Sequence, residues 1–326
     1  MLFRELQSKA LRLRKAIRAR INQAAGDRDL YGRRLPPFSA ASDRACRLGI
    51  VCIVKNESAY IGEWLQFHIL QGATDFFIYD NGSTDDTLEV AQKYSAGANC
   101  TMIPWRTFAI ADEHPFSIQS LAYAHALCNF GPRLRRMAFI DVDEFLFSPS
   151  GAQLTAVLNE LERLPSIAVP WLNFGPNGHQ TRPQGLVIEN YTECAPHPLL
   201  ASQRSLLRYK SIVDPLKVAA MASHLFPLRE HGSVAINEKG RMIEQHNVTD
   251  PSFVVTEKLR LNHYFTRSRA EIQIRIEKGR VSHNGSVVEN YIERRLKAYS
   301  QQTARDETIL QFVPELRKRM ELVRQQ

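Results

Sequence analysis

Short apolar runs that alternate with helical patterns constrain the fold of this chain more than any other feature. Ile50 to Val54 is a continuous, mostly β-branched run, which is typical of a strand buried on both faces. Similar runs follow at 76–79, 101–103 and 137–140, and the segments between them have the apolar spacing of helices. Alternating strands and helices predict an α/β fold with a mostly parallel central sheet and helices on both of its faces.

Polar clusters follow directly after three of these predicted strands. Because ligands of such sheets lie outside the carboxyl ends of the strands, we expect the clusters to form one site. The first two offer amides and carboxylates for ribose hydroxyls and a base edge, and the third offers hard oxygen ligands for Mg²⁺ or Mn²⁺. The chain has neither a GxGxxG nor a P-loop motif, which argues against the usual dinucleotide and P-loop classes. The clusters are Lys55, Asn56 and Glu57, then Asp80 and Asn81, then Asp141, Asp143 and Glu144.

Together with their flanking residues, these clusters resemble those of glycosyltransferases with the GT-A fold. The resemblance is closest to the family 2-like group related to glycosyltransferase family 92, and it covers about residues 49–280. It implies a nucleotide-diphospho-sugar transferase fold with a mostly parallel central sheet. The segments that carry it are 53–57, 63–65, 79–85, 139–146, 171–175 with 178–179, 210–213 and 262–268.

The resemblance implies that the first two clusters bind the nucleotide of the donor. Lys55, Asn56 and Glu57 would line the nucleotide pocket, and Asp80 and Asn81 would hold the base. Many family 2 enzymes have an acid that reads the uracil edge at the position of Asn81. This chain has an amide there, so the choice between a uridine and a guanosine donor stays open.

The resemblance also implies a metal site for Mn²⁺ or Mg²⁺. Asp141 and Asp143 would form its DxD motif, with Asp143 the direct ligand and Asp141 nearer to the ribose or to a metal-bound water. Glu144 would support them from behind. His224 and His263 are candidates for a further ligand from the second half of the chain, and His263 is preferred because it stands at the end of a predicted strand or loop.

A transfer that inverts the anomeric centre needs a general base near the acceptor hydroxyl. The candidates are Glu189, His179 and Asp214, and Glu189 is preferred because it directly follows a strand-like run. Lys210, together with Arg208, would neutralise the departing diphosphate, since electrostatic stabilisation is the main task in such chemistry.

The loop from 171 to 185 is rich in Gly, Pro and aromatic residues. Trp171 and Phe174 in this loop could stack on a sugar ring of the acceptor, while packing in the core is the alternative for Trp171. Helices are predicted at 154–161, 269–280 and 290–324, and a strand at 167–169.

The charge of the chain is concentrated at its N-terminus. Residues 1–49 contain 12 Lys+Arg and 4 Asp+Glu, so 30 of each remain in 50–326 and the whole net charge of +8 lies in the first segment. Residues 1–25 have the pattern of an amphipathic helix with cationic polar faces, which favours binding to an anionic membrane surface. Packing on the body or on a second subunit, and an RNA-binding arm, are the alternatives. Because the body is neutral, we expect no nucleic-acid partner.

Four segments follow from these patterns. They are a basic helix and linker at 1–48, a nucleotide-binding half at 49–150, an acceptor-binding half of the same domain at 151–265, and C-terminal helices at 266–326. The five cysteines are scattered without CxxC pairs, which favours a reducing compartment. No apolar run reaches the length of about 18 residues that a membrane span needs. We therefore expect a cytoplasmic protein that is peripheral on the inner face of the membrane.

The predicted function is a metal-dependent transfer of a sugar from a nucleotide-diphosphate donor to a hydroxyl of a glycan or lipid-linked acceptor. Surface polysaccharide or glycolipid synthesis is the expected setting. One alternative is an inactive carbohydrate- or membrane-binding module with the same fold. The other, a DxD phosphatase, is disfavoured because three βα units precede the motif and Phe145 follows it.

Overall fold

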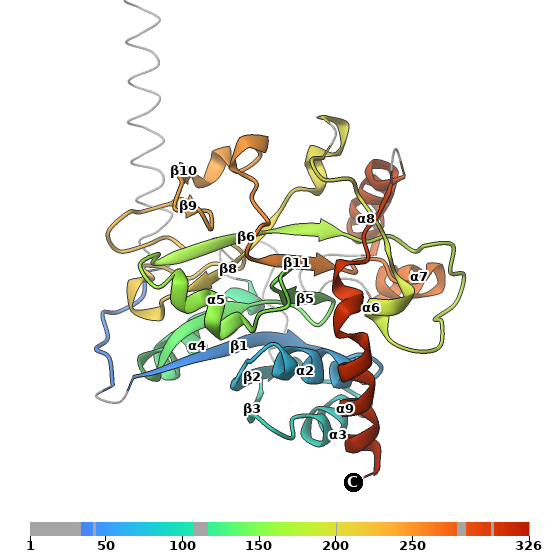
Figure 1. Ribbon diagram of the computed structural model, residues 1–326, viewed down its shortest axis with the longest axis horizontal. Coiled ribbons are helices and arrows are strands. Elements are labelled where there is room, and N and C mark those ends of the chain that lie inside the picture. The colour runs from blue at the N-terminus through green and yellow to red at the C-terminus, as the bar shows by residue number, and fades with distance from the viewer. Residues whose placement is uncertain are drawn as a thin grey trace, which may run out of the picture.

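A mixed eight-stranded sheet forms the centre of the molecule, in the strand order β3-β2-β1-β4-β8-β6-β11-β5 (Figure 1). The computed structural model describes residues 34–41, 44–106, 117–199, 201–278, 285–300 and 303–325. The strands of the sheet are β1 (Ala45–Val54), β2 (Asp75–Asp80), β3 (Asn99–Pro104), β4 (Leu134–Phe139), β5 (Glu144–Phe147), β6 (Ser166–Asn173), β8 (Tyr209–Val213) and β11 (Arg260–His263).

The first half of the sheet is parallel and confirms the predicted alternation of strands and helices. β1 pairs in parallel with β2 and β4, and β2 pairs in parallel with β3. Ile50 belongs to the core on the side of α2, and Val51 to the core on the side of α4, so β1 is buried on both faces. The helices of this half are α2 (Ile61–Leu70), α3 (Thr87–Tyr94) and α4 (Ile118–Asn129).

The second half extends the same sheet with strands that run in both directions. β8 is antiparallel to both β4 and β6, β11 is parallel to β6, and β5 is antiparallel to β11. β5 comes from the predicted nucleotide-binding half and β11 from the predicted acceptor-binding half. The two halves therefore share one continuous sheet.

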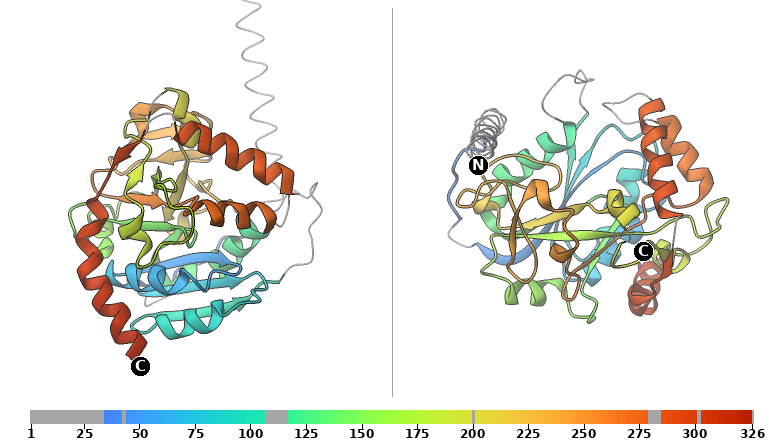
Figure 2. Two further views of the ribbon diagram at one scale, coloured as in Figure 1. Left: turned by 90° about the vertical axis from the view of Figure 1, so that its right-hand side faces the viewer. Right: turned by 90° about the horizontal axis from the view of Figure 1, so that it is seen from above.

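The remaining elements pack around this sheet. α9 lies along α2 and α3 and is the red helix that ends at the C-terminus in Figure 2. Its Leu316, Met320 and Val323 are buried, so this helix packs on the body through an apolar stripe. Among the described residues, no helix has the length and apolar character that crossing a bilayer requires. These elements are α5 (Leu154–Glu160), α6 (Val187–Asn190), α7 (Arg269–Lys278), α8 (Gly285–Tyr299), α9 (Val313–Gln325), β7 (Glu193–Cys194) with β12 (Ala304–Arg305), and β9 (Val234–Ile236) with β10 (Met242–Glu244).

Three local predictions differ from the structure. The predicted helix at 290–324 is divided, because α8 ends at Tyr299 and α9 begins at Val313. The described part of the predicted linker is packed on the body, because Leu35 is buried and its N–H donates to the carbonyl of Ala219 at 2.9 Å. The strand-like run at 186–188 is instead the start of the short helix α6. The predicted helix at 1–25 lies outside the described residues.

The strand that carries Glu144 is held by two buried side chains of α2. The indole N–H of Trp64 donates to the carbonyl of Glu144 at 2.8 Å. Nδ1 of His68 donates to the carbonyl of Trp64 at 2.8 Å, and Nε2 accepts from the N–H of Leu146 at 3.1 Å. Burial lowers the pKa of His68 to about 3, so the imidazole is neutral and both hydrogen bonds are formed.

We expect His68→Leu to destabilise the protein and to flatten its pH dependence. The variant leaves the buried N–H of Leu146 unpaired, which costs about 1–3 kcal/mol at pH 7. Because the folded pKa lies below the unfolded value of 6.5, wild type loses stability as pH falls from 6.5 toward 3. By pH 5.5 this loss is on the order of 1 kcal/mol, and the variant lacks it.

Urea unfolding at pH 7 and pH 5.5 measures both effects. His231→Leu is the matched control, because His231 is exposed. Equal pH dependence in wild type and His68→Leu would contradict the prediction.

Candidate functional site

The loops that follow β1 and β2 are interlocked at the carboxyl edge of the sheet. The N–H of Asn56 donates to Oγ of Ser83 at 3.0 Å, and Oδ1 of Asn56 accepts from the N–H of Thr84 at 2.8 Å. Asn56 has a φ of 57°, a left-handed conformation that an asparagine tolerates better than most residues. The structure therefore brings the first two predicted clusters together.

The individual side chains of these clusters differ in their surroundings. The carboxylate of Asp80 accepts from the N–H of Ser83 at 3.0 Å, and the N–H of Asn81 donates to the carbonyl of Val54 at 2.9 Å. Asp80 and Asn81 are both largely buried, whereas Lys55 is exposed.

The third cluster lies at the end of β4, where Asp141 is held by residues from two other elements. Its Oδ2 accepts from Nζ of Lys210 at 2.8 Å, and its Oδ1 accepts from Nε2 of Gln119 at 2.9 Å. Lys210 is on β8, which starts beside the end of β4 because the two strands are antiparallel. Sequence reasoning missed Gln119, whose position in α4 gave no signal of a polar role.

Lys210 is buried between two carboxyl groups. Its Nζ also lies 3.5 Å from Oε1 of Glu144. Burial would lower the pKa of Lys210, but Asp141 and Glu144 outweigh burial and raise it, so the ammonium is charged. Burial raises the pKa of Glu144 well above its usual range, and the nearby Lys210 opposes this shift. Lys210 therefore holds Asp141 in place instead of facing an open pocket.

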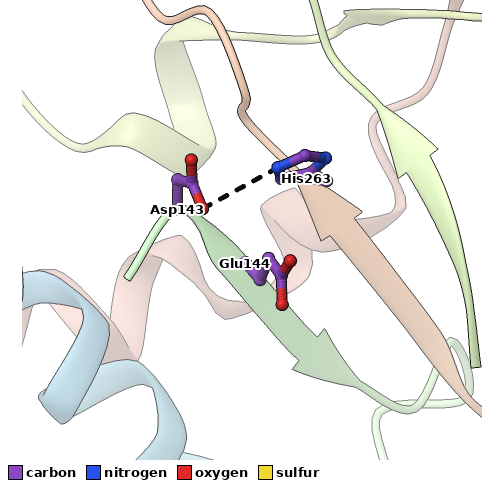
Figure 3. A group of neighbouring side chains, drawn as sticks. All are labelled: Asp143, Glu144 and His263. Carbon is purple, nitrogen blue, oxygen red and sulfur yellow. Dashed lines mark ion pairs between the residues drawn. The ribbon is translucent and has the colours of Figure 1, made fainter. Parts of the chain in front are cut away.

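Asp143, Glu144 and His263 form a cluster that could hold a metal ion (Figure 3). One ligand atom from each lies within 4.8 Å of the others, and Nε2 of His263 is 3.8 Å from Oδ1 of Asp143. The register of β11 and β5 sets this arrangement, because His263 pairs directly with Glu144. The structure therefore brings together Asp143 and His263, which lie 120 residues apart in the sequence.

The orientation of the His263 ring is fixed by Asn173. Oδ1 of Asn173 lies 3.1 Å from Nδ1 of His263 and 2.6 Å from Nη2 of Arg295, while Nδ2 of Asn173 donates to the carbonyl of Leu206 at 3.0 Å. An amide oxygen only accepts, so Nδ1 of His263 carries the proton and Nε2 presents its lone pair toward Asp143. Burial lowers the pKa of His263, which keeps the imidazole neutral.

This donor set fits Mn²⁺ or Mg²⁺. Carboxylate oxygens suit both ions, and a neutral imidazole adds a ligand that favours a transition metal such as Mn²⁺. Oε1 of Glu144 is buried and accepts no hydrogen bond from the described residues, and its contact with Nζ of Lys210 is long, at 3.5 Å. Burial would raise the pKa of Asp143, but the nearby Arg275 outweighs it and holds the pKa below its usual range, so Asp143 is ionised.

Two arginines that sequence reasoning missed pair with acids of the site. Nη2 of Arg275, on α7, lies 2.6 Å from Oδ2 of Asp143. Nη1 of Arg267 lies 3.2 Å from Oε2 of Glu57, and its guanidinium lies 3.4 Å from the ring centre of Tyr60. The signal for Arg267 was its place in the segment 262–268, whereas Arg275 sits in an ordinary helical pattern.

The structure brings none of the three predicted base candidates into contact with Asp143 or His263. Glu189 pairs with Arg317 at 2.7 Å and accepts from the N–H of Leu186 at 2.8 Å. Nε2 of His179 donates to the carbonyl of Asn190 at 3.1 Å.

Asp214 directly follows β8, at the end of that strand that is farther from the cluster. β8 begins with Tyr209 and Lys210 beside the site and runs away from it, because it is antiparallel to β4. At its far end, Asp214 accepts from the N–H of Leu216 at 3.0 Å and pairs with Arg44.

The predicted acceptor residues have different environments. Phe174 is fully buried against Tyr264, with ring centres 4.8 Å apart, so it cannot stack on a ligand. Trp171 packs on His263, with ring centres 4.1 Å apart, and also lines a pocket. Leu199, Arg204 and other residues complete that pocket. His224 is not part of the metal cluster, and its Nδ1 donates to the carbonyl of Tyr209 at 3.0 Å.

Comparison with protein families gives a match over most of the sheet and the helices that follow it. The profile of glycosyltransferase family 92 matches residues 50–299. The chain belongs to glycosyltransferase family 92. With the sheet order above, membership confirms the predicted α/β fold of GT-A type and the suspected family relationship.

Curated relatives in plants carry the same family name. A family 92 protein of Oryza sativa subsp. japonica is 30% identical over 186 residues, which cover 56% of this chain and 29% of the relative. A family 92 protein of Ricinus communis is 31% identical over 207 residues, which cover 60% of this chain and 34% of the relative. The chain thus spans about a third of the length of these relatives.

Solved structures are similar only at a low level. S. aureus TarS 1–349 is 14% identical with a TM-score of 0.35, covering 77% of this chain and 71% of that one. Glucosyl-3-phosphoglycerate synthase from Mycobacterium tuberculosis, in complex with Mn²⁺, UDP-glucose and phosphoglyceric acid, is 20% identical with a TM-score of 0.26, covering 44% and 50%.

We expect Asn173→Ala to weaken Mn²⁺ binding about tenfold or more, because removing the hydrogen-bond partner of a metal-ligating histidine has effects of this size. The variant frees the His263 ring to rotate and to exchange tautomers. Manganese titration followed by electron paramagnetic resonance measures the affinity.

Asn173→Asp keeps an acceptor for Nδ1 of His263 and should restore most of the affinity. Asn159→Ala is the control, because Asn159 is exposed on α5. Wild-type affinity in Asn173→Ala would show that the amide does not position the ring.

Proposed function

We propose that this protein is a metal-dependent glycosyltransferase that moves a sugar from a nucleotide-diphosphate donor to a hydroxyl acceptor. The observation that carries the proposal is the cluster of Asp143, Glu144 and His263 at the carboxyl edge of the sheet, beside the interlocked loops after β1 and β2. Family membership supports the same reaction class.

The residues of the cluster have distinct roles in this proposal. Asp143 and His263 hold Mn²⁺ or Mg²⁺, and Glu144 lies behind them. A divalent cation bound there supplies Lewis-acid stabilisation of the leaving diphosphate. Asp141, fixed by Lys210 and not itself a direct ligand, orients the ribose or a metal-bound water.

The loops after β1 and β2 bind the nucleoside in this proposal. Lys55, Asn56 and Glu57 line the pocket, and Asp80 and Asn81 contact the base. Either uridine or guanosine would fit an amide at position 81. A thermal-shift screen of UDP- and GDP-sugars with Mn²⁺ identifies the base and the sugar together.

The acceptor is proposed to be a glycan or a lipid-linked glycan that approaches Trp171. This indole lines a pocket and lies directly against His263, so a ligand there would be close to the metal cluster. Phe174 has no part in the proposal, because it is buried. Inverting transfer is retained as the expected stereochemistry, and neither Glu189, His179 nor Asp214 is assigned as its base.

We expect Asp143→Asn to reduce metal-dependent hydrolysis of the donor sugar by about a hundredfold or more, since the charge that binds the metal is lost. The assay measures release of UDP or GDP with and without Mn²⁺. Asp86→Asn is the matched control, because Asp86 is exposed at the start of α3.

Full turnover in Asp143→Asn would contradict the assignment of Asp143 as a metal ligand. Absence of UDP and GDP binding in calorimetry would favour the inactive carbohydrate-binding module. Metal-dependent phosphatase activity without sugar transfer would favour the phosphatase, although Phe145 is a core residue here.

We infer a separate role for the basic N-terminal segment in membrane attachment. Deleting residues 1–25 should release the protein from anionic vesicles while donor hydrolysis persists, because the body is neutral and carries the site. Co-sedimentation with phosphatidylserine vesicles measures attachment, and phosphatidylcholine vesicles are the control. Loss of hydrolysis with unchanged vesicle binding would instead make the segment part of the fold. The inner membrane face as its location is part of this proposal.

A further inference from the structure

Arg275 forms an ion pair with one oxygen of Asp143, the carboxylate that is proposed to bind the metal. Its Nη2 lies 2.6 Å from Oδ2 of Asp143, and its Nη1 donates to the carbonyl of Phe265. The other oxygen of Asp143, Oδ1, faces Nε2 of His263 at 3.8 Å. The carboxylate of Asp143 therefore has one oxygen paired with the guanidinium of Arg275, while the other oxygen faces the proposed metal site.

A guanidinium and a divalent cation on the same carboxylate repel each other. Asp143 is 5% exposed, so water screens this repulsion poorly. Binding of the metal alone must either tolerate the repulsion or break the pair between Arg275 and Asp143. Either route makes the affinity for the free metal lower than the ligand set alone would give.

A diphosphate removes this conflict because it offers the guanidinium a new partner. Arginine binds phosphate through two parallel hydrogen bonds, at least as well as it binds a carboxylate. Once Arg275 moves to a phosphate oxygen, Asp143 is left for the metal. We propose that Arg275 exchanges Asp143 for the donor diphosphate, so that metal and donor bind cooperatively. This inference rests on the proposed function.

Three described basic side chains pair with acids of the site, and Arg275 is the most exposed of the three. Its side chain is 44% exposed, compared with 10% for Arg267 and 2% for Lys210. Arg267 is held by Glu57 and by the ring of Tyr60. Lys210 is enclosed by Asp141 and Glu144. The sequence predicted that Lys210 neutralises the departing diphosphate. In this inference, Arg275 has that role instead.

Arg275→Gln tests the exchange through two binding measurements that require no turnover. Titration of Mn²⁺ alone, followed by electron paramagnetic resonance, should show about tenfold tighter binding than wild type, because the competing charge is gone. Titration of UDP and of GDP at saturating Mn²⁺ should show about tenfold weaker binding of whichever nucleotide wild type binds. The two changes have opposite signs, which a general loss of structure would not produce.

Two further variants complete the experiment. Arg294→Gln removes the same charge from an exposed position on α8 and should leave both affinities unchanged. Arg275→Lys keeps the charge but not the two-pronged geometry, so its Mn²⁺ affinity should stay near wild type while nucleotide binding weakens. This variant preserves the test if Arg275→Gln does not fold.

Two results would overturn the inference. Mn²⁺ binding to Arg275→Gln that is no tighter than to wild type would show that Arg275 does not compete with the metal. Nucleotide affinity that is unchanged would show that Arg275 does not reach the diphosphate. If no variant and no wild-type protein binds UDP or GDP, the proposed donor site fails, while the Mn²⁺ titration still decides whether Arg275 and the metal compete.

Discussion

Three carboxyl groups within four residues at the end of β4 are the constraint on which the rest of the site depends. Asp141, Asp143 and Glu144 are crowded at one edge of the sheet, and Asp143 and Glu144 are almost fully buried. Charges of one sign this close cannot all be buried without counter-charges or protons. The protein places cations beside them: Lys210 pairs with Asp141 and lies 3.5 Å from Oε1 of Glu144, and Arg275 pairs with Asp143.

The pairing of strands in the mixed sheet brings these partners together from distant parts of the sequence. Lys210 is 69 residues from Asp141 and Arg275 is 132 residues from Asp143. β8 is antiparallel to β4, so its first residues reach the acids, and β11 pairs with β5, so its last residue, His263, faces them. The direction of each strand thus decides which side chains enter the site and which, like Asp214, lie at the farther end of a strand.

The same strand directions explain how much of this could be predicted from the sequence. The parallel half was predictable because its strands are continuous apolar runs and its polar clusters follow them directly. β5 was missed because its residues overlap the acidic motif, and the run before Glu189 is too short to distinguish a strand from a helix. Asp214 was misplaced because local sequence does not reveal that β8 is antiparallel. Arg275 was missed because an arginine in a helical pattern usually lies on a solvated face.

The ion pairs of the site give a physical reason for the proposed link between metal binding and donor binding. Glu57, Asp141 and Asp143 contribute three negative charges, and their partners Arg267, Lys210 and Arg275 contribute three positive ones. The charges of these three ion pairs sum to zero. A divalent cation alone would leave two uncompensated positive charges next to buried groups, and the diphosphate of a nucleotide sugar alone would leave two negative ones. In the proposed function, the metal and the donor together preserve the neutrality of these three ion pairs, so we expect them to bind as one unit.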